Sequence, residues 1–130
     1  MRPVTALALV GAAYAVAGCG ASANDEVQAK LQQFAHAVSS RDPVTLCRDV
    51  LAPGLVARLA AAGLRCETAM TTFVDGVTDP TLHVAGVHVD GTRASAVVRT
   101  GARGQPSSIQ TVALTDTAHG WRLTSLASPR

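Results

Sequence analysis

The side chains with the most distinctive chemistry in this sequence are its three cysteines, Cys19, Cys47 and Cys66. Cys19 follows one aliphatic and two small residues, Val16-Ala17-Gly18. Small side chains leave the peptide bond before a cysteine open to a peptidase, and the thiol can accept a diacylglyceryl group. The amine released by cleavage can be acylated as well. Two or three acyl chains hold a protein stably on a bilayer, because each buried CH₂ contributes about 0.8 kcal/mol.

The residues before Cys19 have the composition of an export leader. Met1-Arg2-Pro3 carries a positive charge, and residues 4–17 are uncharged and mostly apolar. That run is shorter than the about 20 residues of a membrane span, and it is typical of a signal peptide. Its end resembles the bacterial lipobox. We therefore predict a signal peptide over residues 1–18, a flexible tether over 19–24, and a lipid anchor on the extracytoplasmic face of the cell membrane. An ordinary secretory leader and an uncleaved anchor are the alternatives.

Lipid on Cys19 would leave Cys47 and Cys66 as an even remainder in an exported chain. Such a pair predicts a disulfide. Closing a loop of that length stabilises a fold by roughly 3 kcal/mol. A redox or metal-binding pair is the alternative, but the spacing is not C-x-x-C and no histidine lies between the two cysteines.

Charged residues are few and nearly balanced, with 11 basic and 9 acidic side chains in 130 residues. This balance excludes a basic nucleic-acid-binding face and a polybasic membrane patch. Most carboxylates occupy predicted caps and turns, where they stabilise local structure: Asp25, Asp42, Asp79, Asp90 and Asp116. The sequence reveals no acid/base pair and no glycine-rich phosphate loop. We therefore predict no catalytic residue and no cofactor.

His83 and His88 are the best candidates for metal ligands. A separation of five residues places them on opposite faces of a regular strand. The apolar residues around them change register, so a bulge near Ala85-Gly86 would bring both histidines to one face. No third ligand is evident, and we predict no metal site. His36 and His119 are expected to be solvated and in a turn, respectively.

Apolar spacing predicts four helices in the first half. Val27, Leu31, Phe34 and Val38 form one helical stripe, with Asn24 or Asp25 as the expected cap. Asp42-Pro43 is typical of a second helix start. The third helix is expected to follow Pro53-Gly54 and stop at Gly63, and the fourth to start near Cys66 and reach residue 77.

Strand-like alternation replaces the helical period after Pro80. We predict strands over residues 82–89, around 94–98, over 110–116 and over 121–126, with a hairpin turn at Asp90-Gly91 and a polar loop over 101–107. The predicted fold class is α+β, with N-terminal helices packed on a curved four-stranded antiparallel sheet. Length and pattern indicate one domain over residues 25–130.

Several residue groups, in order, carry a family resemblance: Phe34 and Ala37, Arg41-Asp42, Leu46-Cys47 before Leu51-Ala52-Pro53, Cys66-Glu67, Val87-x-Val89-x-Gly91, and Gly120-Trp121-Arg122-Leu123. Over about residues 25–127 the chain resembles small actinobacterial lipoproteins with a nuclear-transport-factor-2-like (NTF2-like, cystatin-like) domain. The resemblance implies a cone formed by a helix and a bent sheet, with a cavity at the open end. It implies no single function, because such domains serve as enzymes, small-molecule binders or assembly modules.

The positions expected to face inward are nearly all apolar, which suits an apolar ligand or a fully packed core. We predict a non-enzymatic, lipid-anchored envelope protein that binds an apolar small ligand or an envelope protein partner. Phe34, Phe73 and Trp121 are the candidate ligand contacts, although Trp121 could instead cap the sheet. The alternatives are a lyase- or isomerase-type enzyme in the cone, and an accessory or homodimeric subunit that acts through the sheet face.

Overall fold

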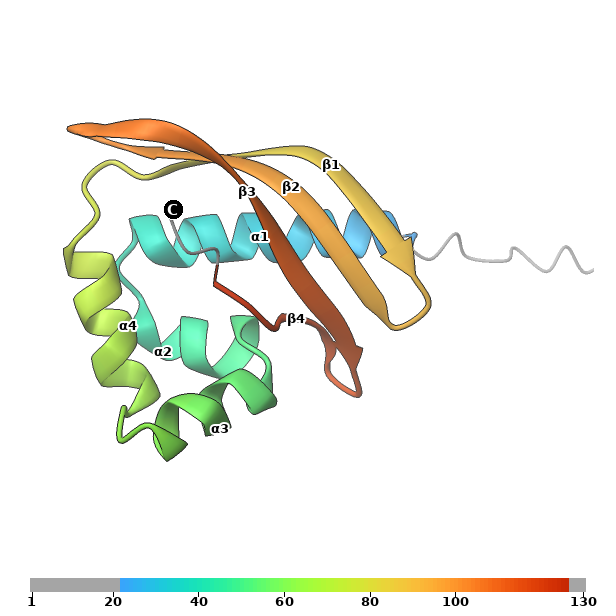
Figure 1. The fold of residues 1–130 in the computed structure, drawn as a ribbon, viewed down its shortest axis with the longest axis horizontal. Coiled ribbons are helices and arrows are strands. Elements are labelled where there is room, and N and C mark those ends of the chain that lie inside the picture. The colour runs from blue at the N-terminus through green and yellow to red at the C-terminus, as the bar shows by residue number, and fades with distance from the viewer. Residues whose placement is uncertain (1–21, 127–130) are drawn as a thin grey trace, which may run out of the picture.

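A computed structural model describes residues 22–126 as a helical half followed by a sheet (Figure 1). The elements are α1 (Ala23–Ser39), α2 (Pro43–Thr45), the π-helix η1 (Leu46–Val50), α3 (Pro53–Ala61), α4 (Cys66–Asp75), β1 (Thr81–Asp90), β2 (Arg93–Ala102), β3 (Gln105–Thr117) and β4 (Gly120–Leu123). The predicted leader and Cys19 lie outside the described residues. Within residues 22–126, no helix is long and apolar enough to cross a membrane.

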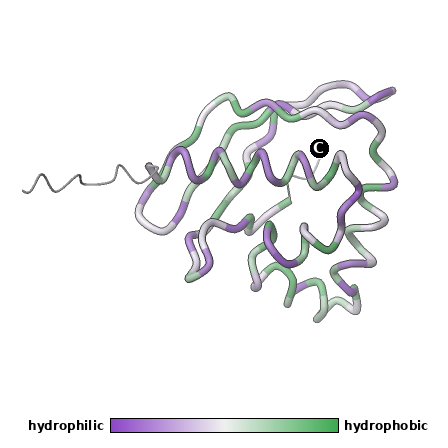
Figure 2. Tube along the Cα trace, turned by 180° about the vertical axis from the view of Figure 1, so that it is seen from behind, coloured by the Kyte–Doolittle hydropathy of each residue, from purple (hydrophilic) through white to green (hydrophobic). Residues whose placement is uncertain are grey.

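Helix α1 runs along the inner side of the curved sheet (Figure 1). Its apolar stripe is confirmed, since Val27 and Leu31 are fully buried, and hydrophobic and hydrophilic positions alternate along it in Figure 2. The predicted caps were wrong: the Ser22 hydroxyl accepts the hydrogen bond from the Asp25 amide at 3.2 Å. Because the helix therefore begins at Ala23, the last two residues of the predicted 19–24 tether are helical.

The second predicted helix is present but changes type along its length. Asp42 caps α2, because its carboxylate accepts bonds from the Thr45 amide at 3.0 Å and the Thr45 hydroxyl at 2.7 Å. The chain then widens into η1 before it turns at Leu51. The fourth helix ends at Asp75, two residues earlier than predicted.

The Asp42 cap predicts a pH-dependent contribution to stability. The side-chain and then the backbone hydrogen bonds from Thr45 hold the pKa of Asp42 below its usual value. The folded state thus favours the carboxylate, so its stabilisation is complete above about pH 4 and is lost as the pH falls further. We expect Asp42→Ala to lower the melting temperature at pH 7 and to lower it less in strong acid. Thermal melts beside the exposed control Asp116→Ala test this. An equal loss for Asp42→Ala at both pH values would contradict it.

The four strands pair antiparallel in the order β1-β2-β3-β4, which confirms the α+β prediction. A register shift between Val84 and Gly86 confirms the expected bulge in β1. The predicted loop over residues 101–107 was wrong. Strands β2 and β3 continue through it as a hairpin, in which Thr100 pairs with Ser108 and Ala102 with Gln105. Gly104, at a φ of 76°, supplies the left-handed turn residue.

Strand β4 is shorter than the predicted 121–126 and ends at Leu123. At that point the chain segment after η1 reaches the sheet edge, since the Ala52 amide donates to the Leu123 carbonyl at 2.8 Å. The core lies between α1, η1, α4 and the inner face of the sheet. Among residues 22–126, every buried residue falls between Val27 and Leu123. A chain of residues 20–130 therefore keeps all of these buried residues and omits the predicted leader and Cys19.

Candidate functional site

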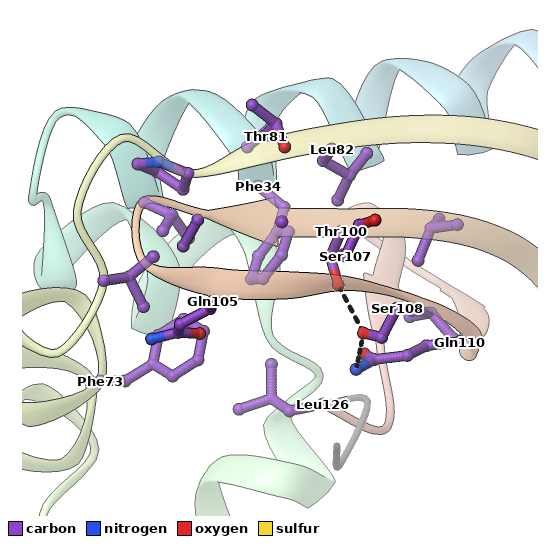
Figure 3. A pocket seen from close by; sticks show the side chains of 18 of the residues that line it. Phe34, Phe73, Thr81, Leu82, Thr100, Gln105, Ser107, Ser108, Gln110 and Leu126 are labelled. Atoms are coloured by element: carbon purple, nitrogen blue, oxygen red, sulfur yellow. Dashed lines mark hydrogen bonds between the residues drawn. The ribbon is translucent and has the colours of Figure 1, made fainter. Parts of the chain in front are cut away.

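The main cavity of the described structure lies at the C-terminal end of α1 and has a volume of about 530 Å³. Helices α1 and α4 form one side (Figure 3). The start of β1, the end of β2 and the first half of β3 form the other. Leu126 adds an apolar contact after β4. Part of the predicted apolar lining is therefore present around this cavity, namely Phe34, Val38, Phe73, Val112 and Leu123.

Phe34 and Phe73 form the aromatic part of the lining. Their ring centroids are 6.5 Å apart, with planes inclined by 30°, a spacing typical of favourable aromatic pairs. Phe34 belongs to the apolar stripe of α1, whereas Phe73 is on α4 and is 36% exposed. The structure thus brings together two of the three residues that the sequence indicated.

The predicted disulfide between Cys47 and Cys66 is confirmed, with a Cα–Cα distance of 6.0 Å. It joins η1 to the first residue of α4. Met70 and Val74 hold the buried side of α4 in the core. Together these contacts fix the helix so that Phe73 faces Phe34 across the cavity.

A chain of uncharged polar side chains lines the strand side of the pocket. The hydroxyls of Thr100 and Ser108 lie 3.3 Å apart, and the Gln110 amide donates to the Ser108 hydroxyl at 3.0 Å (Figure 3). Sequence reasoning missed this chain because it ended the flanking strands before and after a polar loop. The alternation of Ser108, Gln110 and Val112 could have revealed it, since residues two apart share a face of a strand.

No side chain that lines the cavity is ionisable, within the part of the chain that the structure describes. The polar lining consists of threonine, serine and glutamine side chains, and the remainder is apolar, glycine or proline. The pocket can therefore donate and accept hydrogen bonds, but residues 22–126 offer it no acid or base for proton transfer.

Trp121 lies apart from this pocket, although the sequence analysis grouped it with Phe34 and Phe73. Its side chain is 3% exposed and faces inward from β4. It borders a smaller hollow of about 290 Å³ beside Lys30 and Gln33 of α1. The indole nitrogen is buried and has no hydrogen-bond partner among residues 22–126. The side chain is a member of the hydrophobic core.

The groups with shifted pKa values are also away from the main pocket. The Lys30 ammonium donates to the Asp49 carbonyl at 2.8 Å, and the Arg122 guanidinium donates to the same carbonyl. Partial burial, and then the charge of Arg122, lower the pKa of Lys30. Arg48 pairs with the Asp49 carboxylate at 3.1 Å and lowers the pKa of that group. These contacts tie α1 and β4 to the end of η1.

The histidine pair is placed on the outer face of the sheet. His83 and His88 are both exposed, opposite Arg99 and Ser95 of β2. The bulge gives them the same face, as expected. No cluster of three or more potential metal ligands occurs among the described residues.

Comparison with known proteins connects this architecture to a fold. No family model and no curated protein matches the sequence. An NTF2-like protein of unknown function from Silicibacter pomeroyi DSS-3 has a similar structure, with a TM-score of 0.57 at 16% identity, over 78% of this chain and 89% of that one. A candidate dehydratase of the NTF2-like family from Streptomyces avermitilis gives 0.53 at 21% identity, over 82% and 95% of the chains.

A de novo designed NTF2 fold protein is also similar, with a TM-score of 0.54 at 11% identity, over 82% of this chain and 87% of that one. Likeness at such low identity establishes the fold, and the same fold serves many chemistries. The fold of residues 22–126 is therefore NTF2-like.

Proposed function

We propose that this NTF2-like domain binds a small apolar ligand in the pocket between Phe34, Phe73 and the adjoining ends of β1, β2 and β3. We propose also that the domain does not change the ligand chemically. The observation that carries the proposal is a cavity of about 530 Å³ whose lining contains no ionisable side chain. Pockets of roughly 300–1,000 Å³ hold small organic ligands. The apolar walls favour such a ligand by about 25 cal/mol per Å² of apolar surface removed from water.

An enzyme in the same cone is disfavoured by the same lining. General acid/base catalysis requires a titratable group within hydrogen-bond reach of the substrate. The Streptomyces neighbour is described as a candidate dehydratase, and loss of water from a substrate requires proton transfer. No ionisable side chain of residues 22–126 lines this pocket, whereas Glu26 and Lys30 border the smaller hollow beside Trp121. Their placement supports a binding module.

A titration with a neutral fluorescent dye, 1-N-phenylnaphthylamine, tests the proposal on the 20–130 chain. We expect a saturable rise in dye fluorescence with one site per chain. A parallel titration with an unrelated protein of similar size controls for nonspecific adsorption of the dye. A linear, unsaturable signal, or none, would rule out the pocket as an apolar ligand site.

We further propose that lipid on Cys19 anchors the domain to the extracytoplasmic face of the membrane. The support is the sequence Val16-Ala17-Gly18-Cys19, followed by only a few residues before α1. Phe34 lies about 16 Å along α1 from Ala23, at a rise of about 1.5 Å per residue. The pocket would therefore be at the end of the domain away from the anchor.

This anchor predicts a change of cellular fraction. Cys19→Ala should move the protein from the membrane fraction to a soluble or uncleaved form, because neither acyl chains nor the thiol that accepts them would remain. Fractionation of the expressing bacterium measures the cellular location, and mass spectrometry of the N-terminus measures cleavage and acylation. Membrane partition of a correctly cleaved Cys19→Ala chain at the wild-type level would refute the anchor.

A further inference from the structure

We infer that the pocket selects ligands whose polar end is uncharged, such as an alcohol, ester or amide, and that Thr100, Ser108 and Gln110 bind that end. This inference rests on the proposed function, because it assigns a ligand class to the same pocket. It goes beyond that function by predicting rejection of the corresponding carboxylates.

The polar chain retains hydrogen-bonding capacity after its internal bonds are counted. The contact between the Thr100 and Ser108 hydroxyls uses one O–H, and the bond from Gln110 to Ser108 uses one N–H. A threonine, a serine and a glutamine together supply two O–H donors, two N–H donors and an amide oxygen. Among residues 22–126, one O–H, one N–H and the Gln110 amide oxygen thus have no further partner. This set matches a hydroxyl, which donates and accepts, or a carbonyl, which accepts.

Three arginines of the described residues bind groups outside the lining. Arg103, next to the lining residue Ala102, pairs with Asp79 at the surface. Arg41 pairs with Asp75 at 3.4 Å, and Arg58 donates to the Thr124 carbonyl at 2.9 Å. A carboxylate in the pocket would lose hydration without gaining a paired charge. Burial of an unpaired charge costs far more than burial of a neutral group that makes its hydrogen bonds.

The hydrogen-bonded polar chain occupies one part of the lining, which would orient a ligand with one polar terminus. Figure 3 shows Ser108 and Gln110 on one side of the view and Phe73, with Gln105 beside it, on the other. The aromatic pair is positioned by α1 and α4, and the polar chain by β2 and β3. An apolar chain would therefore lie against Phe34 and Phe73, with its polar terminus at Gln110.

Competition between two ligands of equal chain length tests this selectivity. The 20–130 chain is saturated with 1-N-phenylnaphthylamine at pH 7, and the dye is displaced by 1-decanol or by decanoate, which is ionised at this pH. We expect decanol to displace the dye at a concentration at least about tenfold lower than decanoate requires. Equal displacement, or preference for decanoate, would overturn the inference and leave the pocket as an apolar site.

A substitution in the polar chain tests the assigned contact. Gln110→Leu introduces an apolar side chain of similar size and removes the amide. The affinity for decanol should therefore fall about threefold to tenfold. Direct dye titration of the variant gives the dissociation constant needed to calculate its decanol affinity, and a saturable signal shows that the pocket still forms. Thr111→Ala, on the exposed face of β3, is the matched control and should change neither affinity.

The outcomes separate this inference from the proposed function. Dye binding with unchanged decanol affinity in Gln110→Leu would overturn the polar assignment alone. Absence of dye binding by the wild-type chain would refute the proposed function, and the inference with it. If Gln110→Leu fails to bind dye, Ser108→Ala is used in its place, and the same loss of decanol affinity is expected. Dye binding with unchanged decanol affinity in Ser108→Ala would overturn the polar assignment.

Discussion

Replacement of both disulfide cysteines, Cys47→Ala with Cys66→Ala, should lower the free energy of unfolding by roughly 3 kcal/mol. The bond closes a loop with a sequence separation of 19, and a cross-link of that length lowers the entropy of the unfolded chain and so raises its free energy by about this much. Small domains have a total stability of only about 5–15 kcal/mol, so the loss would be a large part of it. Urea denaturation of the 20–130 chain measures the effect.

Reduction provides the matched control for this double substitution. Dithiothreitol should shift the wild-type urea midpoint towards that of the double variant and leave the variant unchanged. Mass spectrometry after alkylation without reduction should find no free thiol at Cys47 or Cys66. Full labelling of both cysteines, or a wild-type midpoint insensitive to reduction, would refute a stabilising bond.

Ala35→Trp should weaken ligand binding by roughly seventyfold. Ala35 lines the pocket from α1 and is partly buried, so the larger side chain would occupy space that the ligand needs. An indole that displaces about 100 Å² of apolar ligand contact removes about 2.5 kcal/mol of binding free energy. Dye titration of the 20–130 chain measures the dissociation constant.

A tryptophan elsewhere on the surface separates occlusion from a general effect of the substitution. Ala57→Trp on the exposed side of α3 is the control, and its affinity should equal that of the wild type. Thermal melts of both variants report whether they fold. Unaltered dye affinity in a folded Ala35→Trp chain would place the dye outside the pocket.

The sequence predicted best those features that depend on periodicity or on one strong local signal. The stripe that begins at Val27 and Leu31 is buried as expected, because helical spacing leaves only one face apolar. The change of register in β1 correctly indicated a bulge, because a strand has a strict period of two. The Cys47–Cys66 pairing followed from counting cysteines.

The polar half of the pocket was missed, since it adjoins residues that resemble a loop. Residues 101–107 include two glycines and a proline, which commonly mark turns. Pairing of β2 with β3 overrides that tendency and extends the hairpin to Ala102 and Gln105. Tertiary pairing of this kind is not visible in local composition. Thr100, Ser108 and Gln110 were therefore absent from the predicted site.

The placement of Trp121 depended on a further long-range contact. Its sequence position beside a turn left open whether it closed the pocket or capped the sheet. In the fold, the turn before β4 lies beside Lys30, towards the N-terminal end of α1, whereas the pocket begins at Phe34. Which half of α1 a strand end meets is set by strand length and twist, and β4 proved shorter than predicted.

The central claim, that the cavity of this NTF2-like domain is a ligand site, is tested most directly by NMR mapping. A ¹H–¹⁵N titration of the 20–130 chain with 1-decanol should shift the amide signals of Phe34, Leu82, Val98 and Gln110, which line the cavity. Signals from the outer sheet face, where Val97 and Ile109 are exposed, should remain in place. Shifts confined to that outer face, or no shifts at saturating decanol, would contradict the account.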